Sequence, residues 1–577
     1  MIAVRRLSTI FARPITWIAL LVAAVLVVLV AAPLAGLVAA TVREDGGGSW
    51  ADVLASSLSQ NLFWQPLGNS LLVAIGTGLI STLLGGFLAW VVVMSDVPGR
   101  RIIGVLATIP FALPSFAIAL AWESVFRNDR LGGNPGLLAS LGVAVPDALS
   151  WGALPVTLTL VAHYYSLSFV VVAAALAGIG GDLIAAAELT GASRARVAAR
   201  IALPAVAPAL LSGFLLAFAE GISNFAVPAL LGLPVRFQTL STRLYGAIST
   251  GDTERGYVLA ILLVLVAAVV LYLGNRATRG RSFAVITGKA SRARTVRTGP
   301  WRWPLLAASL ALVTATTIIP GLVLAVSTLL RRTNDLDGGF TLHFWIGASD
   351  PSIAQGFRGV LSDPVLLQAG MGTIALGASV ALCAGALGLV AAYVVRRVRS
   401  NVVGAGIGFL AYVPFLIPGI ALGAAFIAQF GAPIGPLPSL YGTFAILVVA
   451  GTAASLPFAF QTSRSALGQV SNELEEAALV AGAGTGRRIG RILLPLSARG
   501  VTGGAMLVFV TMVRDLSLVV LLVTPATPLL AVQTFRYTSE GFTQHANAIT
   551  LVIAAVSVAA TLLARRLQGA RRPWTES

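Results

Sequence analysis

Long apolar runs separated by short polar stretches dominate the chain. A helix needs about 20 consecutive apolar residues to cross the hydrocarbon core of a bilayer. The first apolar run is longer than the core of a signal peptide and has no clear cleavage site, so it predicts a first spanning helix. In total the pattern predicts twelve spans, near residues 15–42, 68–94, 102–126, 152–179, 205–231, 256–274, 304–329, 366–395, 402–428, 440–462, 498–523 and 547–564. We therefore expect an all-α polytopic membrane protein with twelve transmembrane helices.

The composition supports a membrane protein and indicates its orientation. Of the 577 residues 57% are hydrophobic and 11% are charged, whereas about 25% of the residues of soluble domains are charged. The formal net charge is +17, and nearly all of the positive charge is arginine. A basic chain can bind nucleic acid, but these arginines lie in alternate short loops between apolar runs. That placement favours the positive-inside rule over a nucleic-acid partner and predicts that both termini are cytoplasmic.

The chain contains an internal repeat. A basic linker near 275–303 divides it almost at its middle, which predicts a first half at 1–274 and a second half at 304–577. Residues 109–121 match residues 413–425, and residues 165–169 match residues 454–458. The best match aligns 183–210 with 474–501 at one constant offset of 291. We therefore expect two six-helix halves in parallel orientation, fused into one chain.

The repeated stretch at 472–500 carries most of the local charge in an otherwise apolar region. Asn472 is a plausible N-cap, and Glu475 follows at the spacing of a capping box. Strong helix formers come next, and Gly482 suits a helix C-terminus. The pattern predicts a short helix, a glycine turn and a second helix that enters the membrane at Leu494-Pro495. Such a basic, amphipathic loop is suited to binding another protein.

At these residues the chain resembles the permeases of binding-protein-dependent ABC importers. Their cytoplasmic motif is Glu-Ala-Ala, three residues, Gly, nine residues, then Ile-x-Leu-Pro. The second half carries all of it, at Glu476, Ala477, Ala478, Gly482, Ile492, Leu494 and Pro495. The first half carries Ala185, Ala186, Ala187, Gly191, Ile201, Leu203 and Pro204. Ala185 replaces the glutamate of the motif there, and Glu188 lies one helical turn later, so either Glu188 takes over its contact or the two loops bind unequally.

The resemblance implies an ABC type I importer permease in the bacterial cytoplasmic (inner) membrane. It implies that each motif loop docks onto one of two separate ATPase subunits, and that an extracytoplasmic solute-binding protein delivers the cargo. The chain itself is then a transport subunit in the lipid bilayer, neither an enzyme nor a cofactor-binding protein. Phe283 stands where a phosphate-binding loop ending at Lys289 would need its first glycine. The fused build resembles ferric-iron permeases, and thiamine, phosphonate, polyamine and sulfate remain alternative cargoes.

Four polar residues fall within predicted spans and are functional candidates for that reason. Glu220 and Asn224 lie in the fifth span, and Arg514 and Asp515 lie in the eleventh. The offset of 291 pairs Asn224 with Asp515, so both halves place a polar group at the same depth. These residues either line a solvated pathway or gate between the halves, or form buried interhelical hydrogen bonds and ion pairs.

The remaining reactive side chains give no sign of catalysis or of metal binding. His163 could face a pathway, but a single histidine among aromatic residues is more often packed. His343 and His545 lack metal-ligand spacing. Cys383, the only cysteine, is predicted to be a small buried apolar residue. We therefore expect no metal site and no catalytic residues.

The main alternative is a secondary transporter of the major facilitator type, because that fold also has two parallel six-helix halves. The segment 96–101, with sequence DVPGRR, resembles the loop motif of that superfamily at four of six positions. That fold gives no reason for two matched Leu-Pro loops, so the importer permease is the favoured hypothesis.

Overall fold

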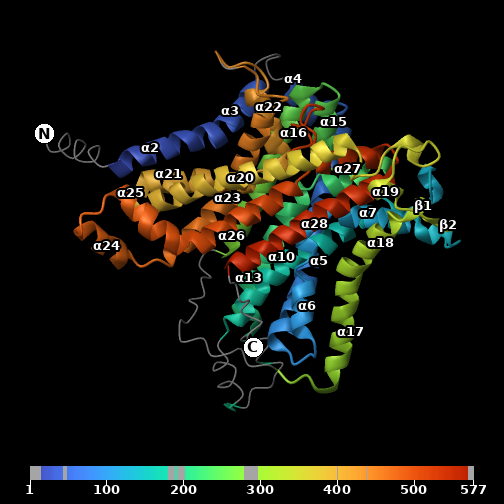
Figure 1. Cartoon of the computed structure of the whole chain (residues 1–577), viewed down its shortest axis with the longest axis horizontal. Coiled ribbons are helices and arrows are strands. Elements are labelled where there is room, and N and C mark those ends of the chain that lie inside the picture. The colour runs from blue at the N-terminus through green and yellow to red at the C-terminus, as the bar shows by residue number, and fades with distance from the viewer. Residues whose placement is uncertain are drawn as a thin grey trace.

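The computed structural model describes residues 14–42, 48–179, 189–190, 196, 200, 202–278, 296–398, 401–436 and 438–568. Within these ranges ten helices are long and apolar enough to cross a membrane, or up to twelve if each of two bent pairs is one span. The described elements form a helical bundle with a β-hairpin at one end (Figure 1). The expectation of an all-α polytopic membrane protein is confirmed.

The first half is built from long helices connected by short helices and turns. Its helices are α2 (Pro14–Leu26), α3 (Ala32–Ala40), α4 (Gly48–Leu54), α5 (Gln65–Met94), α6 (Arg100–Leu106), α7 (Ser115–Phe126), α8 (Leu137–Ser140), α9 (Asp147–Ser150), α10 (Ala153–Ala177), α13 (Leu203–Ser223), α14 (Ala226–Leu231), α15 (Leu240–Ser249) and α16 (Thr253–Thr278). A π-helical segment, Val27–Ala31, joins α2 to α3, so these two form one continuous span.

The second half repeats this order and adds a hairpin. Its elements are α17 (Arg302–Val313), α18 (Ile319–Ser327), β1 (Leu330–Arg332), β2 (Asp335–Phe340), α19 (His343–Ile346), α20 (Pro364–Arg397), α21 (Asn401–Tyr412), α22 (Gly419–Phe430), α23 (Phe444–Gly468), α24 (Asn472–Val480), α25 (Thr485–Arg488), α26 (Leu494–Val513), α27 (Leu530–Ser539) and α28 (Thr543–Gln568). The strands β1 and β2 pair antiparallel, with Leu330 opposite Phe340.

The third and ninth predicted spans are broken rather than continuous. In the first half the chain bends by 95° between Arg100–Ala112 and Ser115–Phe126. In the second half it bends by 113° between Val402–Leu416 and Gly419–Phe430. Each break falls at the second proline of the repeated motif, Pro114 or Pro418, which has no N–H to donate and disfavours a helical residue before it. The sequence predicted one span at each place, and each is a bent pair of helices.

The first span of each half packs against the other half. Helices α2 and α3 pack against α20, α21 and α22 of the second half, and α17 and α18 pack against α5, α6 and α7 of the first (Figure 1). In the buried cluster at this exchange, Ala19, Val22 and Leu26 meet Ala391 and Phe460. The two halves therefore hold each other through exchanged helices.

Two equivalent glycines allow the backbones of neighbouring helices to approach closely. A Cβ on Gly85 of α5 would lie 2.6 Å from the backbone nitrogen of Phe169 in α10. A Cβ on Gly388 of α20 would lie 2.8 Å from the backbone nitrogen of Phe460 in α23. These equivalent contacts pair Phe169 with Phe460, which is an offset of 291. The predicted match of 165–169 with 454–458 has an offset of 289, so its register is wrong by two residues.

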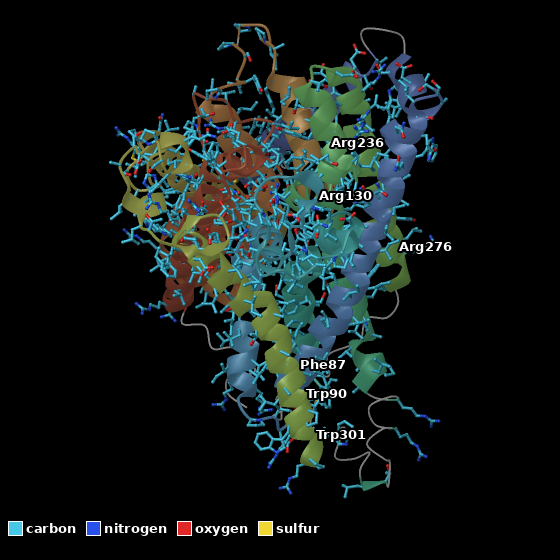
Figure 2. All side chains as sticks on the ribbon, turned by 90° about the vertical axis from the view of Figure 1, so that its right-hand side faces the viewer. Phe87, Trp90, Arg130, Arg236, Arg276 and Trp301 are labelled. Atoms are coloured by element: carbon cyan, nitrogen blue, oxygen red, sulfur yellow. The ribbon has the colours of Figure 1, made fainter. Side chains whose placement is uncertain are left out.

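The start of the second half is anchored on the first half. The Asp96 Oδ1 accepts hydrogen bonds from the backbone N–H of Thr298 at 2.8 Å and from its hydroxyl at 2.6 Å. These two bonds hold the pKa of the Asp96 carboxyl below its ordinary value of 3.8. Figure 2 shows Trp301, just beyond this anchor, at the same end of the molecule as Trp90, with Arg236 towards the opposite end.

Cys383 is exposed on α20, next to the exposed Leu382. The prediction of a buried thiol is wrong, because an apolar run in a spanning helix has one face toward the protein and another toward lipid. Hydropathy does not distinguish these two faces.

Candidate functional site

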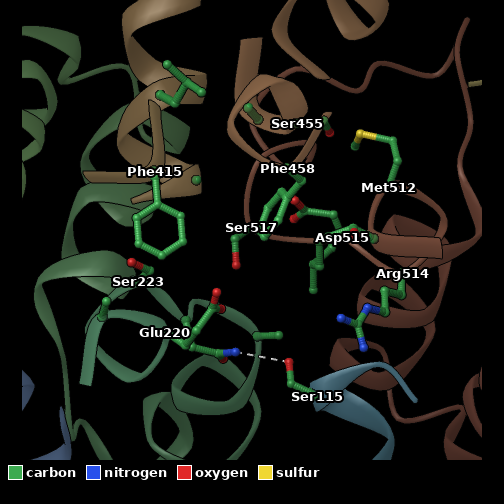
Figure 3. A pocket seen from close by; sticks show the side chains of 18 of the residues that line it. Ser115, Glu220, Ser223, Phe415, Ser455, Phe458, Met512, Arg514, Asp515 and Ser517 are labelled. Atoms are coloured by element: carbon green, nitrogen blue, oxygen red, sulfur yellow. Dashed lines mark hydrogen bonds between the residues drawn. The ribbon is translucent and has the colours of Figure 1, made fainter. Parts of the chain in front are cut away.

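A polar cavity of about 190 Å³ lies where the two halves meet. Residues from α7, α10 and α13 of the first half and from α22, α23 and α26 of the second half line it. All four polar residues singled out in the sequence, Glu220, Asn224, Arg514 and Asp515, are among its lining residues. Figure 3 shows Glu220 and Arg514 entering the cavity from opposite sides.

The lining follows the internal repeat. At the offset of 291, or 304 for the segments around the broken spans, the lining residues pair as Phe111 with Phe415, Ser115 with Gly419, His163 with Ala454, Tyr164 with Ser455, Glu220 with Thr511, Ser223 with Arg514 and Asn224 with Asp515. The cavity thus lies on the pseudo-symmetry axis of the two halves. Its charges do not follow that symmetry, because Glu220 comes from the first half and Arg514 and Asp515 come from the second.

Asn224 and Asp515 have the same local role. Each follows the end of a long helix, α13 or α26, where the chain leaves the helical conformation. The Asn224 Oδ1 accepts the backbone N–H of Val227 at 2.9 Å, and the Asp515 Oδ1 accepts that of Leu518 at 3.1 Å. The sequence placed both residues inside spans. They cap the N–H groups of the segment after each span, which would otherwise lack a partner.

Asn224 also joins three elements of the first half. Its amide nitrogen donates to the Ser115 hydroxyl and to the Tyr164 hydroxyl, both at 3.0 Å (Figure 3 draws the first of these). Ser115 is the first residue of α7 after the break at Pro114, and Tyr164 lies on α10. One amide side chain therefore fixes the broken span, the fourth span and the end of the fifth around the cavity.

Arg514 crosses from the second half to the first. Its Nη1 donates to the backbone oxygen of Leu113 at 3.1 Å, and its guanidinium carbon lies 4.3 Å from the centre of the Phe111 ring. The break at Pro114 frees the carbonyl of Leu113 from the helical pattern, and Arg514 satisfies it. A second bond between the halves runs from the Phe225 N–H to the Ser517 hydroxyl at 3.3 Å.

Two carboxylates line the cavity, Glu220 from the first half and Asp515 from the second, and Glu220 interacts electrostatically with Asp515 and with Arg514. His163 also lines the cavity, with its ring 4.7 Å from that of Tyr164 and 6.3 Å from that of Phe111. The cavity therefore offers two carboxylates, one guanidinium and several hydroxyls. Among the described residues no group of three or more His, Cys, Asp or Glu could hold a metal ion.

A second, smaller cavity of about 140 Å³ also joins the halves. It lies at the far end of α7, where the buried Glu123 pairs with Arg127 at 2.7 Å, and on the hairpin side it is lined by Thr333 and Asn334. Because α7 begins at Ser115, this helix runs from the central cavity to the smaller one.

The motif loop of the second half projects from the bundle. Figure 1 shows α24 at the edge of the molecule, away from the hairpin. Glu476, Ala477 and Gly482 are exposed, as are the apolar side chains of Leu479 and Val480. The chain then passes through α25 and a π-helical segment, Ile489–Leu493, which includes Ile492, into α26 with Leu494 and Pro495 as its first residues.

Gly482 ends α24 as the sequence predicts. Its φ is +78°, in the left-handed region that favours glycine. Its N–H donates to the Leu479 carbonyl at 3.0 Å, and the N–H of Ala483 donates to the Ala478 carbonyl at 2.9 Å. These two bonds form a Schellman motif, which satisfies the last carbonyls of the helix.

The capping box predicted for Asn472 and Glu475 is wrong. The N-cap of α24 is Ser471, Asn472 is the first helical residue, and the cap has no side-chain hydrogen bond. The Glu475 side chain is 0% exposed and forms ion pairs with Arg397 and, at 3.6 Å, with Arg488. It points inward to these arginines because both come from elements packed beneath α24.

The motif loop of the first half lies mostly outside the described residues. This applies to Ala185, Ala186, Ala187, Glu188, Gly191 and Ile201. Leu203 and Pro204 are described and begin α13, as Leu494 and Pro495 begin α26.

Comparison with known proteins identifies the family. The model for the binding-protein-dependent transport system inner membrane component matches twice, at residues 81–280 and 384–576, which together make up more than half of the chain. The chain belongs to this family. It is the permease of an ABC importer, a multi-pass membrane protein in which both halves of the repeat are copies of the family domain. The secondary-transporter alternative is left without support.

Several relatives match the chain, over different extents. A putative ferric transport system permease protein of Haemophilus influenzae is 24% identical over 82% of this chain and 72% of its own length. A ferric transport system permease protein of Actinobacillus pleuropneumoniae is also 24% identical, over 82% of this chain and 66% of its own length. A probable sulfate transport system permease protein of Prototheca wickerhamii is 24% identical over 40% of this chain and 88% of its own length.

The solved structures that match include that of a bacterial ABC transporter involved in the import of the acidic polysaccharide alginate. The TM-score is 0.33 and the identity 18%, over 37% of this chain and 85% of that chain.

Sequence reasoning missed part of the cavity wall. Ser115, Ser517, Phe111 and Phe415 were not singled out, because single hydroxyls and aromatic rings in apolar runs are common. The signal that could have found three of them is the repeat: the offset of 304 pairs Phe111 with Phe415, and Ser115 with Gly419, at the breaks of the two bent spans.

Proposed function

We propose that the chain forms the solute pathway of an ATP-driven importer and that its cargo is ferric iron. The pathway runs through the central cavity, between Glu220 of the first half and Arg514 and Asp515 of the second. The observation that carries this proposal is the cavity itself, since polar side chains from both halves converge there at the pseudo-symmetry axis. An alternating-access motion of the halves would open such a site to one side and then to the other.

The choice of ferric iron rests on two supports. The ferric permeases align over 82% of the chain and so share the fused build, whereas the sulfate relative named above aligns over 40%, about one half. The cavity presents two carboxylates and several hydroxyls, and oxygen ligands are those that hard cations prefer. Ferric iron would be cargo in transit and not a resident metal.

Sulfate is the second candidate, because sulfate permeases are relatives and the cavity contains the guanidinium of Arg514. Arginine binds oxyanions readily. Its guanidinium, however, already donates to Leu113 and lies over Phe111, and two carboxylates line the same cavity. That arrangement favours a cation over an oxyanion. Thiamine, phosphonate and polyamine have no such observation in their favour.

The loop with Glu476, Ala477 and Gly482 is proposed to dock onto an ATPase subunit on the cytoplasmic side, and its counterpart near Gly191 onto a second ATPase subunit. An extracytoplasmic binding protein would deliver the cargo at the opposite end, near the hairpin of β1 and β2. Both termini would then be cytoplasmic, as the arginine-rich loops indicate.

The cargo is tested by uptake of radioactive iron and of radioactive sulfate into cells with and without the gene for this chain. Loss of iron uptake alone supports the proposal, and loss of sulfate uptake alone favours the second candidate. The ATPase contact is tested with Glu476→Arg and Gly482→Asp, each expected to reduce both co-purification of the ATPase and uptake.

Gly484→Asp is the matched control for the loop. Gly484 is exposed two residues farther on, has open space for a side chain and lacks a positive φ. It should have a smaller effect than Gly482→Asp. If uptake and ATPase association both survive Glu476→Arg and Gly482→Asp, the docking role of this loop is wrong.

A further inference from the structure

Glu475 is the only fully buried carboxylate among the described acidic residues of α24, although α24 itself projects from the bundle. Its neighbours Glu473 and Glu476 are exposed. A carboxylate is costly to bury unless it is paired and hydrogen-bonded, so its partners must compensate for the lost hydration.

Three side chains provide that compensation. Arg397 forms an ion pair with Glu475 Oε2, the Arg488 Nη1 lies 3.6 Å from Oε1, and the Tyr393 hydroxyl donates to Oε1 at 3.2 Å. Tyr393 and Arg397 lie at the end of α20, and Arg488 lies on α25. Glu475 thus joins three helices, and we name the group of Tyr393, Arg397, Glu475 and Arg488 the carboxylate latch.

The end of α20 also holds the chain that leads into α24. The Arg396 guanidinium, next to the latch, donates to the backbone oxygens of Leu467 and, at 2.8 Å, Val470. Those carbonyls lie at the end of α23 and in the turn before α24. The entry of the loop and its helix are therefore both fixed to the same turn of α20.

The first half has apolar residues at all four positions of the latch. The offset of 291 places Ile184 opposite Glu475 and Val197 opposite Arg488. The equivalence of Gly85 with Gly388 places Trp90 opposite Tyr393 and Met94 opposite Arg397. A buried ion pair can be replaced by well-packed apolar residues only if all its members change together, and here all four differ.

We propose that the carboxylate latch makes Glu475 a positioning residue for energy coupling. The latch fixes the orientation of α24 relative to α20. When the ATPase moves α24, α20 and the rest of the second half therefore move with it as a rigid body. The inference rests on the proposed docking of α24 onto an ATPase subunit. In the second half this transmission is ionic, whereas the sequence of the first half has apolar residue types at the equivalent positions.

The test uses the full permease co-expressed with its ATPase and binding protein. Glu475→Gln removes the negative charge that Arg397 and Arg488 share. We expect the ATPase to co-purify at the level of the unsubstituted complex, while the amount of solute imported per ATP hydrolysed falls at least about fivefold, the lower end of typical coupling between sites. Glu473→Gln on the same helix is the matched control, because it removes an exposed carboxylate outside the latch, and it should lower this ratio less than Glu475→Gln does.

A second variant separates coupling from folding. The quadruple substitution Glu475→Ile, Arg488→Val, Tyr393→Trp and Arg397→Met installs the residues of the first half and should restore the ratio toward that of the unsubstituted complex, whereas Glu475→Ile alone should not. An unchanged ratio in Glu475→Gln would overturn the proposal, as would equal ratios in the quadruple and single isoleucine variants.

Glu475→Gln could instead lower the amount of assembled complex and the uptake by the same factor, with no change in the solute imported per ATP hydrolysed. In that case the latch is merely structural and the proposal is wrong. Failure of the docking proposal itself is recognised separately, because ATPase association would then survive Glu476→Arg.

Discussion

The contact between α5 and α10 gives a sharp prediction, because Gly85 has almost no room for a side chain. A Cβ there would lie 2.6 Å from both the Phe169 nitrogen and the Tyr165 oxygen, whereas ordinary contact begins at 3.4 Å. Gly85→Ala must therefore push the two backbones apart by up to 0.8 Å. Overpacking of this kind costs about 1–3 kcal/mol. We expect Gly85→Ala to be less stable than a control variant by that amount.

Gly68→Ala is the control, since Gly68 lies on the same helix with no atom within 4 Å of the added Cβ. Alanine gains about 1 kcal/mol of helix propensity over glycine at either site, so this gain cancels in the difference between the variants. The free energies of unfolding are measured by denaturant titration of the purified protein in one detergent. If Gly85→Ala proves as stable as Gly68→Ala, the helices are not held at the distance described here.

Three further predictions concern caps, charge and exposure. Asp515→Asn should keep the cap on the Leu518 N–H and leave the free energy of unfolding close to its original value. Asp515→Ala should lower that free energy by about 1 kcal/mol, measured by denaturant titration. The lowered pKa of Asp96 means that its bonds to Thr298 stabilise the fold fully above pH 3.8 and are lost only as the pH falls through the lowered pKa; protection of the Thr298 amide from hydrogen exchange should therefore persist at neutral pH and disappear in strong acid. Cys383→Ala should change the unfolding free energy by less than about 0.5 kcal/mol in the same denaturant titration, because that side chain is exposed.

The sequence predicts the features that depend on local signals. The apolar runs reveal the spans, and the repeat reveals the two halves and the pairing of Asn224 with Asp515. Gly482 reveals the end of α24, because few other residues adopt a positive φ without strain. These signals lie within a few residues of the structure that they specify.

Features set by distant contacts could not be predicted. A proline marks a possible break in a span, but the 95° and 113° bends depend on how α7 and α22 pack. Glu475 has the spacing of a capping box, and only the approach of Arg397, nearly 80 residues earlier, shows that it is buried. The sequence also does not show that the first span of each half packs against the other half, because an apolar face does not specify its partner.

That exchange has a consequence for biosynthesis. Ala19 and Leu26 belong to a cluster completed by Ala391 and Phe460, so their packing partners emerge from the ribosome roughly 365 to 440 residues later, about 20 to 90 s at ordinary rates of synthesis. During that interval the first span must reside in the bilayer with its packing face toward lipid or a membrane chaperone. Two separately synthesised halves would each display this unmatched face, and they would recognise each other through it. Fusion of the halves ensures that the face meets its own chain first.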